Sequence, residues 1–194
     1  MERHAPETLD DEKRRGRLHI ADPSVDGCCA ARDKRRWFQS RTGTSHVLEI
    51  GPGPGFLSID VARAIPGGRL ELVDIQLEML WKARRRLRRA GVENAGCTQA
   101  NAVKLPFRSG AFDVAFLIAV LGEVSDPKAC LSAIADALRP GGLLSVAELP
   151  GDPDALTEQQ LRALTQDTDL KFLESVRISR ALLASFRGPT QRSR

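Results

Sequence analysis

The chain has 194 residues, enough for one substantial hydrophobic core, and its 42% hydrophobic content is typical of globular proteins. Its net charge of +4 and pI near 9.1 would assist binding to an acidic or nucleic-acid partner without requiring one. The longest apolar stretch, residues 112–121, is far shorter than the roughly 20 residues of a membrane-spanning helix. Residues 1–20 are charged and lack the apolar centre of a secretory signal peptide. We therefore predict a cytoplasmic protein without a membrane span.

The four cysteines do not have the spacing of a metal site or of a disulfide framework. Cys28 and Cys29 are adjacent, whereas Cys97 and Cys130 each stand alone, so no C-x-x-C pair is present. We predict thiols that are buried or unused, and no metal site.

The order of the predicted elements indicates one main domain. Residues 1–43 mix charged and small residues without a sustained period, and we expect a tail with short helices, a candidate lid. From residue 44 to residue 187, apolar runs of strand length alternate with amphipathic helical segments. The predicted elements are a strand at 46–50, a helix at 56–64, a strand at 69–74, a helix at 77–90, strands at 96–100 and 112–118, a helix at 127–138, a strand at 143–148 and a helix at 157–165.

The end of the chain departs from this alternation. Residues 170–178 and 180–187 follow each other as two strands, which is typical of a hairpin, and residues 188–194 have the composition of a disordered tail. We therefore predict an α/β fold: a doubly wound, Rossmann-like, mostly parallel sheet with helices on both faces and a C-terminal antiparallel hairpin.

A glycine-rich turn joins the first predicted strand to the first helix. Residues 49–56 read EIGPGPGF, at the position where a doubly wound sheet opens its binding crevice. The spacing is G-x-G-x-G, not the G-x-G-x-x-G of dinucleotide-binding enzymes, and Pro52 and Pro54 remove two amide donors. The turn therefore favours a ligand such as an amino acid joined to a nucleoside over a pyrophosphate.

A carboxylate ends the second predicted strand. Asp74 stands where an acidic side chain can accept hydrogen bonds from both hydroxyls of a ribose. The structural alternative is that Asp74 caps the helix that begins near Gln76.

With these features in place, five segments in order resemble the class I S-adenosylmethionine-dependent methyltransferases (methyltransferase type 11), in the branch that contains ubiquinone and menaquinone methyltransferases. They are VLEIGPGPG at 47–55, LVDIQLEML at 72–80, NAVKLPF at 101–107, FDV at 112–114 and LRPGG at 138–142. The resemblance covers about residues 44–187, and it implies a Rossmann-like fold and S-adenosyl-L-methionine as cofactor.

The resemblance also implies a set of cofactor-binding residues, position by position. Glu49 and the turn with Gly51, Gly53 and Gly55 would face the methionine part, and Asp74 would hold the ribose. Ile75 and Met79 would flank the adenine, Asn101 and Ala102 would lie beside its amino group, and Ile118 would offer its carbonyl to the ammonium group. For Met79 and Ile118, ordinary core packing is the alternative.

Methyl transfer from a sulfonium mainly requires alignment of the acceptor, the methyl group and sulfur in a pocket with little water. A base, where the acceptor must lose a proton, would come from the segments after the fourth or fifth predicted strand, and we favour Glu148 over Glu123. The alternative for both is a cap or a surface salt bridge. Residues 121–127 read LGEVSDP and lack the Asn/Asp-Pro-Pro-aromatic motif that the superfamily uses to methylate planar nitrogens. A small-molecule or lipid-like acceptor is therefore the leading expectation.

Three other functions compete with this one. The basic run KARRRLRR at 82–89 supports RNA methylation, although we favour a solvated helix face as its explanation. Short recognition regions are compatible with a non-catalytic methyltransferase-like binding module. A nicotinamide-dependent oxidoreductase would require the glycine spacing that the turn lacks.

Overall fold

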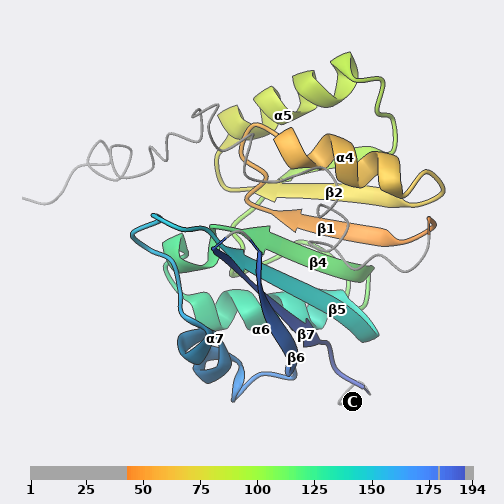
Figure 1. Cartoon of the computed structure of the whole chain (residues 1–194). Helices are drawn as coiled ribbons and strands as arrows, with labels where there is room; N and C mark the ends of the chain where they lie inside the picture. The colour runs from red at the N-terminus through yellow and green to blue at the C-terminus, as the bar shows by residue number, and fades with distance from the viewer. Residues whose placement is uncertain (1–42, 179, 191–194) are drawn as a thin grey trace, which may run out of the picture. The chain divides into compact units, whose positions relative to one another are not determined.

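A seven-stranded sheet with the order β3-β2-β1-β4-β5-β7-β6 organises the domain (Figure 1). The structure is a computed structural model that describes residues 43–178 and 180–190, so the predicted tail and helices of the N-terminal segment lie outside the described residues apart from Gly43. The strands are β1 (His46–Ile50), β2 (Arg69–Asp74), β3 (Ala95–Gln99), β4 (Phe112–Ile118), β5 (Leu138–Glu148), β6 (Lys171–Ile178) and β7 (Ala181–Arg187). The helices are α4 (Phe56–Ala64), α5 (Leu77–Arg89), α6 (Pro127–Ala137), α7 (Glu158–Thr165) and the short 3₁₀ helix η1 (Leu121–Glu123).

The first five strands are parallel, and the last two form the predicted antiparallel hairpin. Ile50 pairs with Val73 of β2 on one side and with Leu117 of β4 on the other. β7 runs antiparallel to both β5 and β6, which places β6 at one edge of the sheet and β3 at the other. The prediction of a doubly wound, mostly parallel sheet with a C-terminal hairpin is confirmed.

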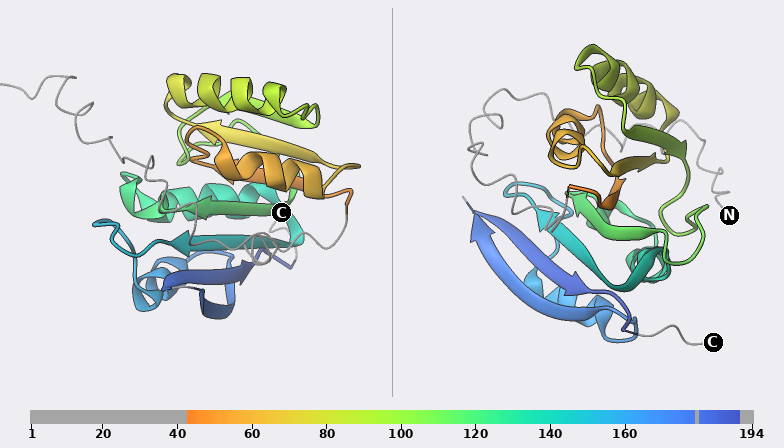
Figure 2. Two further views of the ribbon diagram at one scale, coloured as in Figure 1. Left: turned by 45° about the horizontal axis from the view of Figure 1, so that its top comes forward. Right: turned by 90° about the vertical axis from the view of Figure 1, so that its right-hand side faces the viewer.

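Each face of the sheet packs against its own helices, as strand alternation requires. Val47 of β1 and Leu72 of β2 belong to a buried cluster that includes Val61 of α4 and Ala83 of α5. Residues of the opposite parity, such as Leu48, belong to a second cluster with α6 and α7. Figure 2 shows α4 and α6 on opposite sides of the sheet.

The boundaries of several elements differ from the prediction, most by one residue and that of β5 by five. β5 begins at Leu138 rather than at residue 143, because Pro140 disfavours the helical conformation for Arg139 and the chain leaves α6 directly as a strand. Leu138 then pairs with Phe112, and a register shift follows before the regular pairing of Val114 with Leu143. β3 begins and ends one residue earlier than predicted, and α7 begins at Glu158 because Thr157 is its N-cap, in a capping box with Gln160.

None of the helices in the described ranges has both the length and the apolar character needed to cross a bilayer. The carboxyl ends of β1, β2 and β4 all lie along the same side of the sheet (Figure 1), which is called the edge of the site below and is distinct from the outer strands β3 and β6. The order of the connections reverses between β1 and β4. This switch point is where open α/β sheets bind ligands.

Candidate functional site

The glycine turn after β1 lies directly against the segment that follows β4. Gly51 has φ +65°, and a Cβ built on it would lie 2.4 Å from Cγ2 of Val120, so no larger residue fits between the two segments. Gly53, at φ +52°, has the opposite surroundings: its Cβ would meet nothing within 4 Å. The turn is therefore closed toward β4 at Gly51 and open at Gly53, where a ligand can approach the backbone.

The amides of this turn are already used within the protein. The amide of Gly51 donates to the Val73 carbonyl at 2.8 Å, and the amide of Gly55 donates to the Pro52 carbonyl at 3.0 Å. The amide of Gly53 interacts with the Asp74 carboxylate, and Pro52 and Pro54 have no amide hydrogen. The turn thus offers no free amide for a pyrophosphate, which strengthens the prediction against a dinucleotide.

Asp74 ends β2 beside this turn, and its side chain is largely buried. Burial raises the pKa of its carboxyl group, while the backbone amides of Gln76, Gly53 and Ile75 lower it in part. Oδ1 accepts the Gln76 amide at 2.8 Å, but the N-cap of α5 is Gln76 itself, without a side-chain cap. The alternative that Asp74 is the helix N-cap is therefore wrong.

Apolar and amide side chains adjoin Asp74. Ile75 is 61% exposed although it follows a buried strand, and Met79 is partly buried one turn into α5. Asn101 follows β3, where the Ala100 amide donates to the Asp74 carbonyl at 3.1 Å. Oδ1 of Asn101 accepts the Val103 amide at 3.1 Å. Ala102 packs partly buried against the core that faces α6, so the structure brings all these predicted residues to one edge.

Glu49, which the resemblance placed at the methionine part of the cofactor, is a carboxylate inside β1 with only 4% of its surface exposed. Burial raises its pKa to about 7, and the nearby Ser58 hydroxyl of α4 offsets this in part. Within the described residues, neither Oε2 of Glu49 nor Oγ of Ser58 has a hydrogen-bond partner of acceptable geometry. Oε2 of Glu49 is thus a buried acceptor without full hydrogen bonding, which is costly in a core and fits a donor group supplied by a ligand.

The residues at the end of β4 also lie on the edge of the site. Ile118 is partly buried, and Ala119 takes φ +52°, a conformation that costs free energy for a residue with a Cβ. The Ala119 amide donates to the Ala147 carbonyl of β5 at 2.8 Å, which anchors this turn. Ser58 and Val120 were not predicted, since their roles depend on contacts between distant segments.

Glu148 lies at the end of β5 and is 4% exposed. Neither of its carboxylate oxygens has a hydrogen-bond partner of acceptable geometry in the described part of the chain. Burial raises its pKa to about 7, the Leu156 backbone lowers it in part, and Asp152 and Glu123 add to the increase. The alternative of a surface salt bridge is thus wrong for Glu148.

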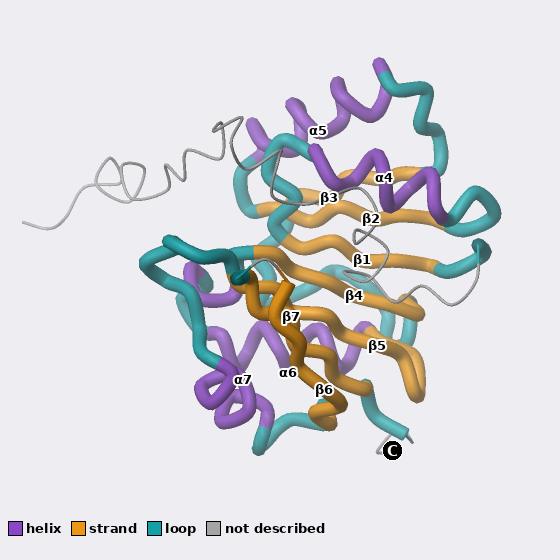
Figure 3. The backbone as a smooth tube through the Cα atoms, in the orientation of Figure 1, coloured by secondary structure: helices purple, strands orange, loops and turns teal. Residues whose placement is uncertain are grey.

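Glu123 lies in η1, beside the loop that joins β5 to α7. A Cβ on Gly122 would lie 1.9 Å from the Asp154 carbonyl oxygen, so η1 packs directly against this loop (Figure 3). Burial raises the pKa of Glu123, and Asp152, Asp154 and Asp74 raise it further. Glu123 and Glu148 therefore lie close enough to influence each other within an acidic environment, on the same edge as the glycine turn.

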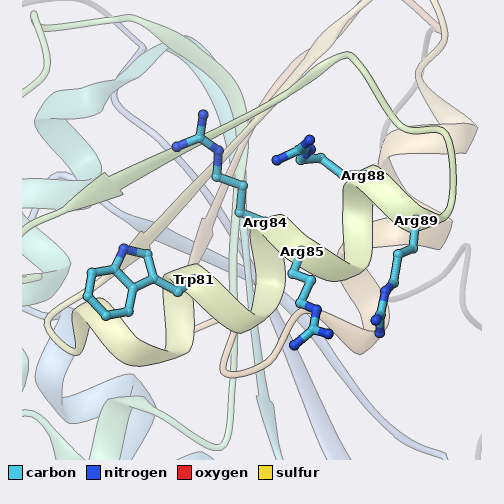
Figure 4. A pocket seen from close by; sticks show the side chains of 5 residues that line it. All are labelled: Trp81, Arg84, Arg85, Arg88 and Arg89. Carbon is cyan, nitrogen blue, oxygen red and sulfur yellow. The ribbon is translucent and has the colours of Figure 1, made fainter.

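Other candidate features lie elsewhere. Among the described residues, no group of three His, Cys, Asp or Glu side chains could hold a metal ion. Burial raises the pKa of the Cys130 thiol to about 12, which leaves it unreactive. An open groove of about 630 Å³ lies on the outer face of α5 (Figure 4) and is lined by Trp81, Arg84, Arg85, Arg88 and Arg89, with no residue of the glycine turn among them.

Comparison with known proteins shows which class of proteins this chain resembles. Residues 47–142 match the family described as a methyltransferase domain. The fold also matches a SAM-dependent methyltransferase from Aquifex aeolicus with a TM-score of 0.72 and 18% identity, over 86% of this chain and 98% of that one. It matches the [4+2]-cyclase SpnF with a TM-score of 0.73 and 17% identity, over 81% of this chain and 79% of that one. The chain therefore contains a class I S-adenosylmethionine-dependent methyltransferase domain, and S-adenosylmethionine is the cofactor of this class.

Curated relatives narrow the resemblance to one branch. The ubiquinone/menaquinone biosynthesis C-methyltransferase UbiE of Shewanella halifaxensis is 38% identical over 104 residues, which are 53% of this chain and 41% of the relative. The same enzyme of Cellvibrio japonicus is 39% identical over 110 residues, which are 56% of this chain and 44% of the relative. The match thus spans less than half the length of these relatives.

Proposed function

We propose that the protein transfers a methyl group from S-adenosylmethionine to a small-molecule or lipid-like acceptor, with residues 44–187 as the cofactor-binding domain. The observation that carries this proposal is one sheet edge that joins the open glycine turn, Asp74 and two buried carboxylates without full hydrogen bonding. The fold alone would not decide the reaction, because similar folds host unrelated chemistry.

The residues of the edge suit the chemical groups of this cofactor. The unpartnered Oε2 of Glu49 would accept a hydrogen bond from the ammonium of the methionine part, assisted by the carbonyl of Ile118. Gly53, whose Cβ position is open, would allow the backbone to approach it, whereas Gly51 and Gly55 keep the turn packed against Val120 and Ala83. This region also favours a cation, because its carboxylates form no ion pair with a lysine or an arginine among the described residues.

The adenosine part would lie across the ends of β2 and β3. Asp74 would accept hydrogen bonds from the ribose hydroxyls through the capacity that its backbone contacts leave free. The exposed Ile75 and the partly buried Met79 would flank the adenine. Covering such an apolar side chain with a ring removes apolar surface from water and thereby stabilises the complex. Oδ1 of Asn101 has a second lone pair for the adenine amino group, and Ala102 would add backbone contact.

The bound cofactor supplies an electrophilic methyl group on a sulfonium with a good leaving group. The protein would hold the acceptor in line with this group and exclude water. Glu148 would accept a proton from the acceptor, since a carboxylate with a pKa of about 7 is poised to take up a proton near neutral pH. Glu123 would hold the acceptor or share the proton, because it lies within the same acidic environment.

The class of acceptor rests on three observations. The curated relatives are named for ubiquinone and menaquinone biosynthesis, and methylation of carbon in such rings requires removal of a proton, which suits Glu148. η1 carries LGE where planar-nitrogen methyltransferases have an Asn/Asp-Pro-Pro-aromatic motif. The acidic edge with Glu123, Asp152 and Asp154 would repel a polyphosphate near the reacting atoms.

The first experiment is calorimetric titration of the full chain with S-adenosylmethionine and, in parallel, with reduced nicotinamide dinucleotide. We expect binding of S-adenosylmethionine alone, because the turn has no free amide for a pyrophosphate. Turnover is then measured as S-adenosylhomocysteine formed with a short-chain prenylated hydroquinone and with a short RNA. Absence of S-adenosylmethionine binding would refute the proposal.

Glu148→Gln separates catalysis from binding. We expect a fall in kcat of about 100-fold or more with an unchanged Kd for S-adenosylmethionine, as is typical of a general base. Asp152→Asn, which removes a neighbouring charge in the loop after β5, is the matched control and should retain most of the activity. Binding of cofactor with no turnover on any acceptor in wild-type protein would instead favour a non-catalytic module.

A further inference from the structure

The outer face of α5 carries an unusual density of uncompensated positive charge. The helix contains six basic residues and one acidic residue, Glu78. Its inner face, with Leu80, Ala83 and Leu87, is buried in the core, and the opposite face is exposed from Trp81 to Arg89. This surface is defined here as the α5 arginine face and consists of Trp81, Arg84, Arg85, Arg88 and Arg89.

The arginines of this face are arranged in two rows. Figure 4 shows Arg84 and Arg88 extending from one side of the helix and Arg85 and Arg89 from the other. Each row is an i,i+4 pair of like charges, which destabilises a helix by a few tenths of a kcal/mol. None of the four forms an ion pair with a described residue, so within the described part of the chain these like charges are not offset by an acidic partner.

Arg86 on the same helix shows what a structural arginine looks like in this protein. Its Nε donates to the Pro54 carbonyl at 3.0 Å, and its guanidinium lies 3.6 Å from the centre of the Phe56 ring. Arg86 therefore ties α5 to the glycine turn. The four arginines of the outer face make no comparable contact with the described residues.

Exposed apolar side chains precede the arginines along the helix. Leu77 is 40% exposed and Trp81 is 63% exposed, and they lie one turn apart at the start of α5. The surface thus changes from apolar near the crevice to basic toward the end of the helix. A large indole in water, followed by four guanidinium groups, is the composition of a helix that lies in the interface of an anionic membrane.

We propose that the α5 arginine face docks the protein on an anionic lipid bilayer, with Trp81 in the headgroup region and the four arginines on lipid phosphates. The charge is complementary to such a surface, and Leu77 adds apolar area that a phosphate backbone would not cover. Binding to RNA would call for several aromatic stacking groups, whereas this face offers one. The start of α5 adjoins the cofactor edge through Ile75 and Asp74, so docking brings the crevice beside the membrane surface.

The test measures binding of the full chain to phosphatidylcholine vesicles with and without phosphatidylglycerol. The fluorescence emission of Trp81 monitors the binding. Trp37, the other tryptophan, is replaced by Phe, so that Trp81 is the reporter. We expect binding to the vesicles with phosphatidylglycerol only, a blue shift of the emission, and weaker binding at high salt.

Arg85→Gln/Arg89→Gln should weaken the vesicle partition coefficient about thirtyfold, since each basic residue near an anionic surface contributes about fivefold. Lys171→Gln/Arg177→Gln removes the same charge from exposed positions on β6, at the far edge of the sheet, and should weaken binding much less. Retained S-adenosylmethionine binding shows that each variant is folded. Equal effects of the two pairs, or binding to a short RNA but not to vesicles, would overturn the proposal, and neither outcome bears on cofactor binding.

Discussion

Gly51 after β1 and Val120 after β4 pack so closely that a Cβ on Gly51 would lie 2.4 Å from Cγ2 of Val120. This contact closes the switch point of the sheet on one side, whereas Gly53, two residues further, faces open space. The same turn therefore contains one glycine required by packing and one that we propose is required by the ligand. The two roles have different consequences when a methyl group is added.

Gly51→Ala should lower the free energy of unfolding by at least about 2 kcal/mol, because positive φ and the clash with Val120 both oppose the new Cβ. Gly53→Ala should cost only about 1 kcal/mol, for positive φ alone, yet should weaken S-adenosylmethionine binding at least tenfold. Urea unfolding and calorimetric titration of both variants measure the two effects. A Gly53→Ala protein with unchanged affinity would contradict the cofactor position.

Asp74→Ala should weaken S-adenosylmethionine binding by about 2–3 kcal/mol, because both ribose hydroxyls would lose a charged acceptor. Asp74→Asn is the sharper variant: it keeps the size of the side chain, so the turn around Gly53 is disturbed less. We expect an intermediate loss of affinity for Asp74→Asn. The measurement is calorimetric Kd, with thermal unfolding as the control for folding, and unchanged affinity in both variants would refute the ribose role.

Binding of the cofactor should depend on pH through Glu49. Its pKa is raised to about 7 by burial, so the carboxyl group is partly protonated at neutral pH. A cationic ligand favours the charged carboxylate and therefore lowers this pKa, so S-adenosylmethionine should bind more tightly as pH rises from about 6 to about 8.

Titration in two buffers of different ionisation enthalpy should detect the release of protons on binding. Glu49→Gln should bind more weakly at about pH 8 and lose most of the pH dependence. Glu148→Gln, which removes the other carboxyl group with a pKa of about 7, should keep it. The opposite pattern would assign the linkage to Glu148.

The sequence predicted the edge of the site better than its interior. Strand ends can be located from hydrophobic periodicity, and parallel strands necessarily share a carboxyl edge, so Asp74, Asn101 and Ile118 lie at or just after the ends of their strands as predicted, while their roles toward the cofactor stay predictions. Burial of Glu148 was not predictable, because it depends on the loop that packs over η1 through Gly122.

The same limit applies to the core beside β1. Ser58 has no sequence signal of its own, since a serine on an amphipathic helix acquires a role only when Glu49 from another element faces it. The early start of β5 at Leu138 likewise depends on pairing with Phe112, a contact between distant positions. Residues 1–42, which hold nearly all of the predicted tail and candidate lid, lie outside the described residues.

The buried Glu148 carboxylate should destabilise the fold at high pH, because its pKa of about 7 in the folded protein lies above the ordinary value of 4.5 that applies to the unfolded chain. The folded state holds this proton more tightly, so the associated stability is fully present below about pH 4.5 and is lost as pH rises through about 7. Glu148→Gln removes the ionisation and should raise the free energy of unfolding by about 1–3 kcal/mol at about pH 8, with little change near pH 4.5. Urea unfolding at the two pH values measures this difference. A stabilised variant with lost turnover would indicate that the carboxylate is retained for chemistry at the expense of stability, whereas a destabilised variant at high pH would assign Glu148 a structural role.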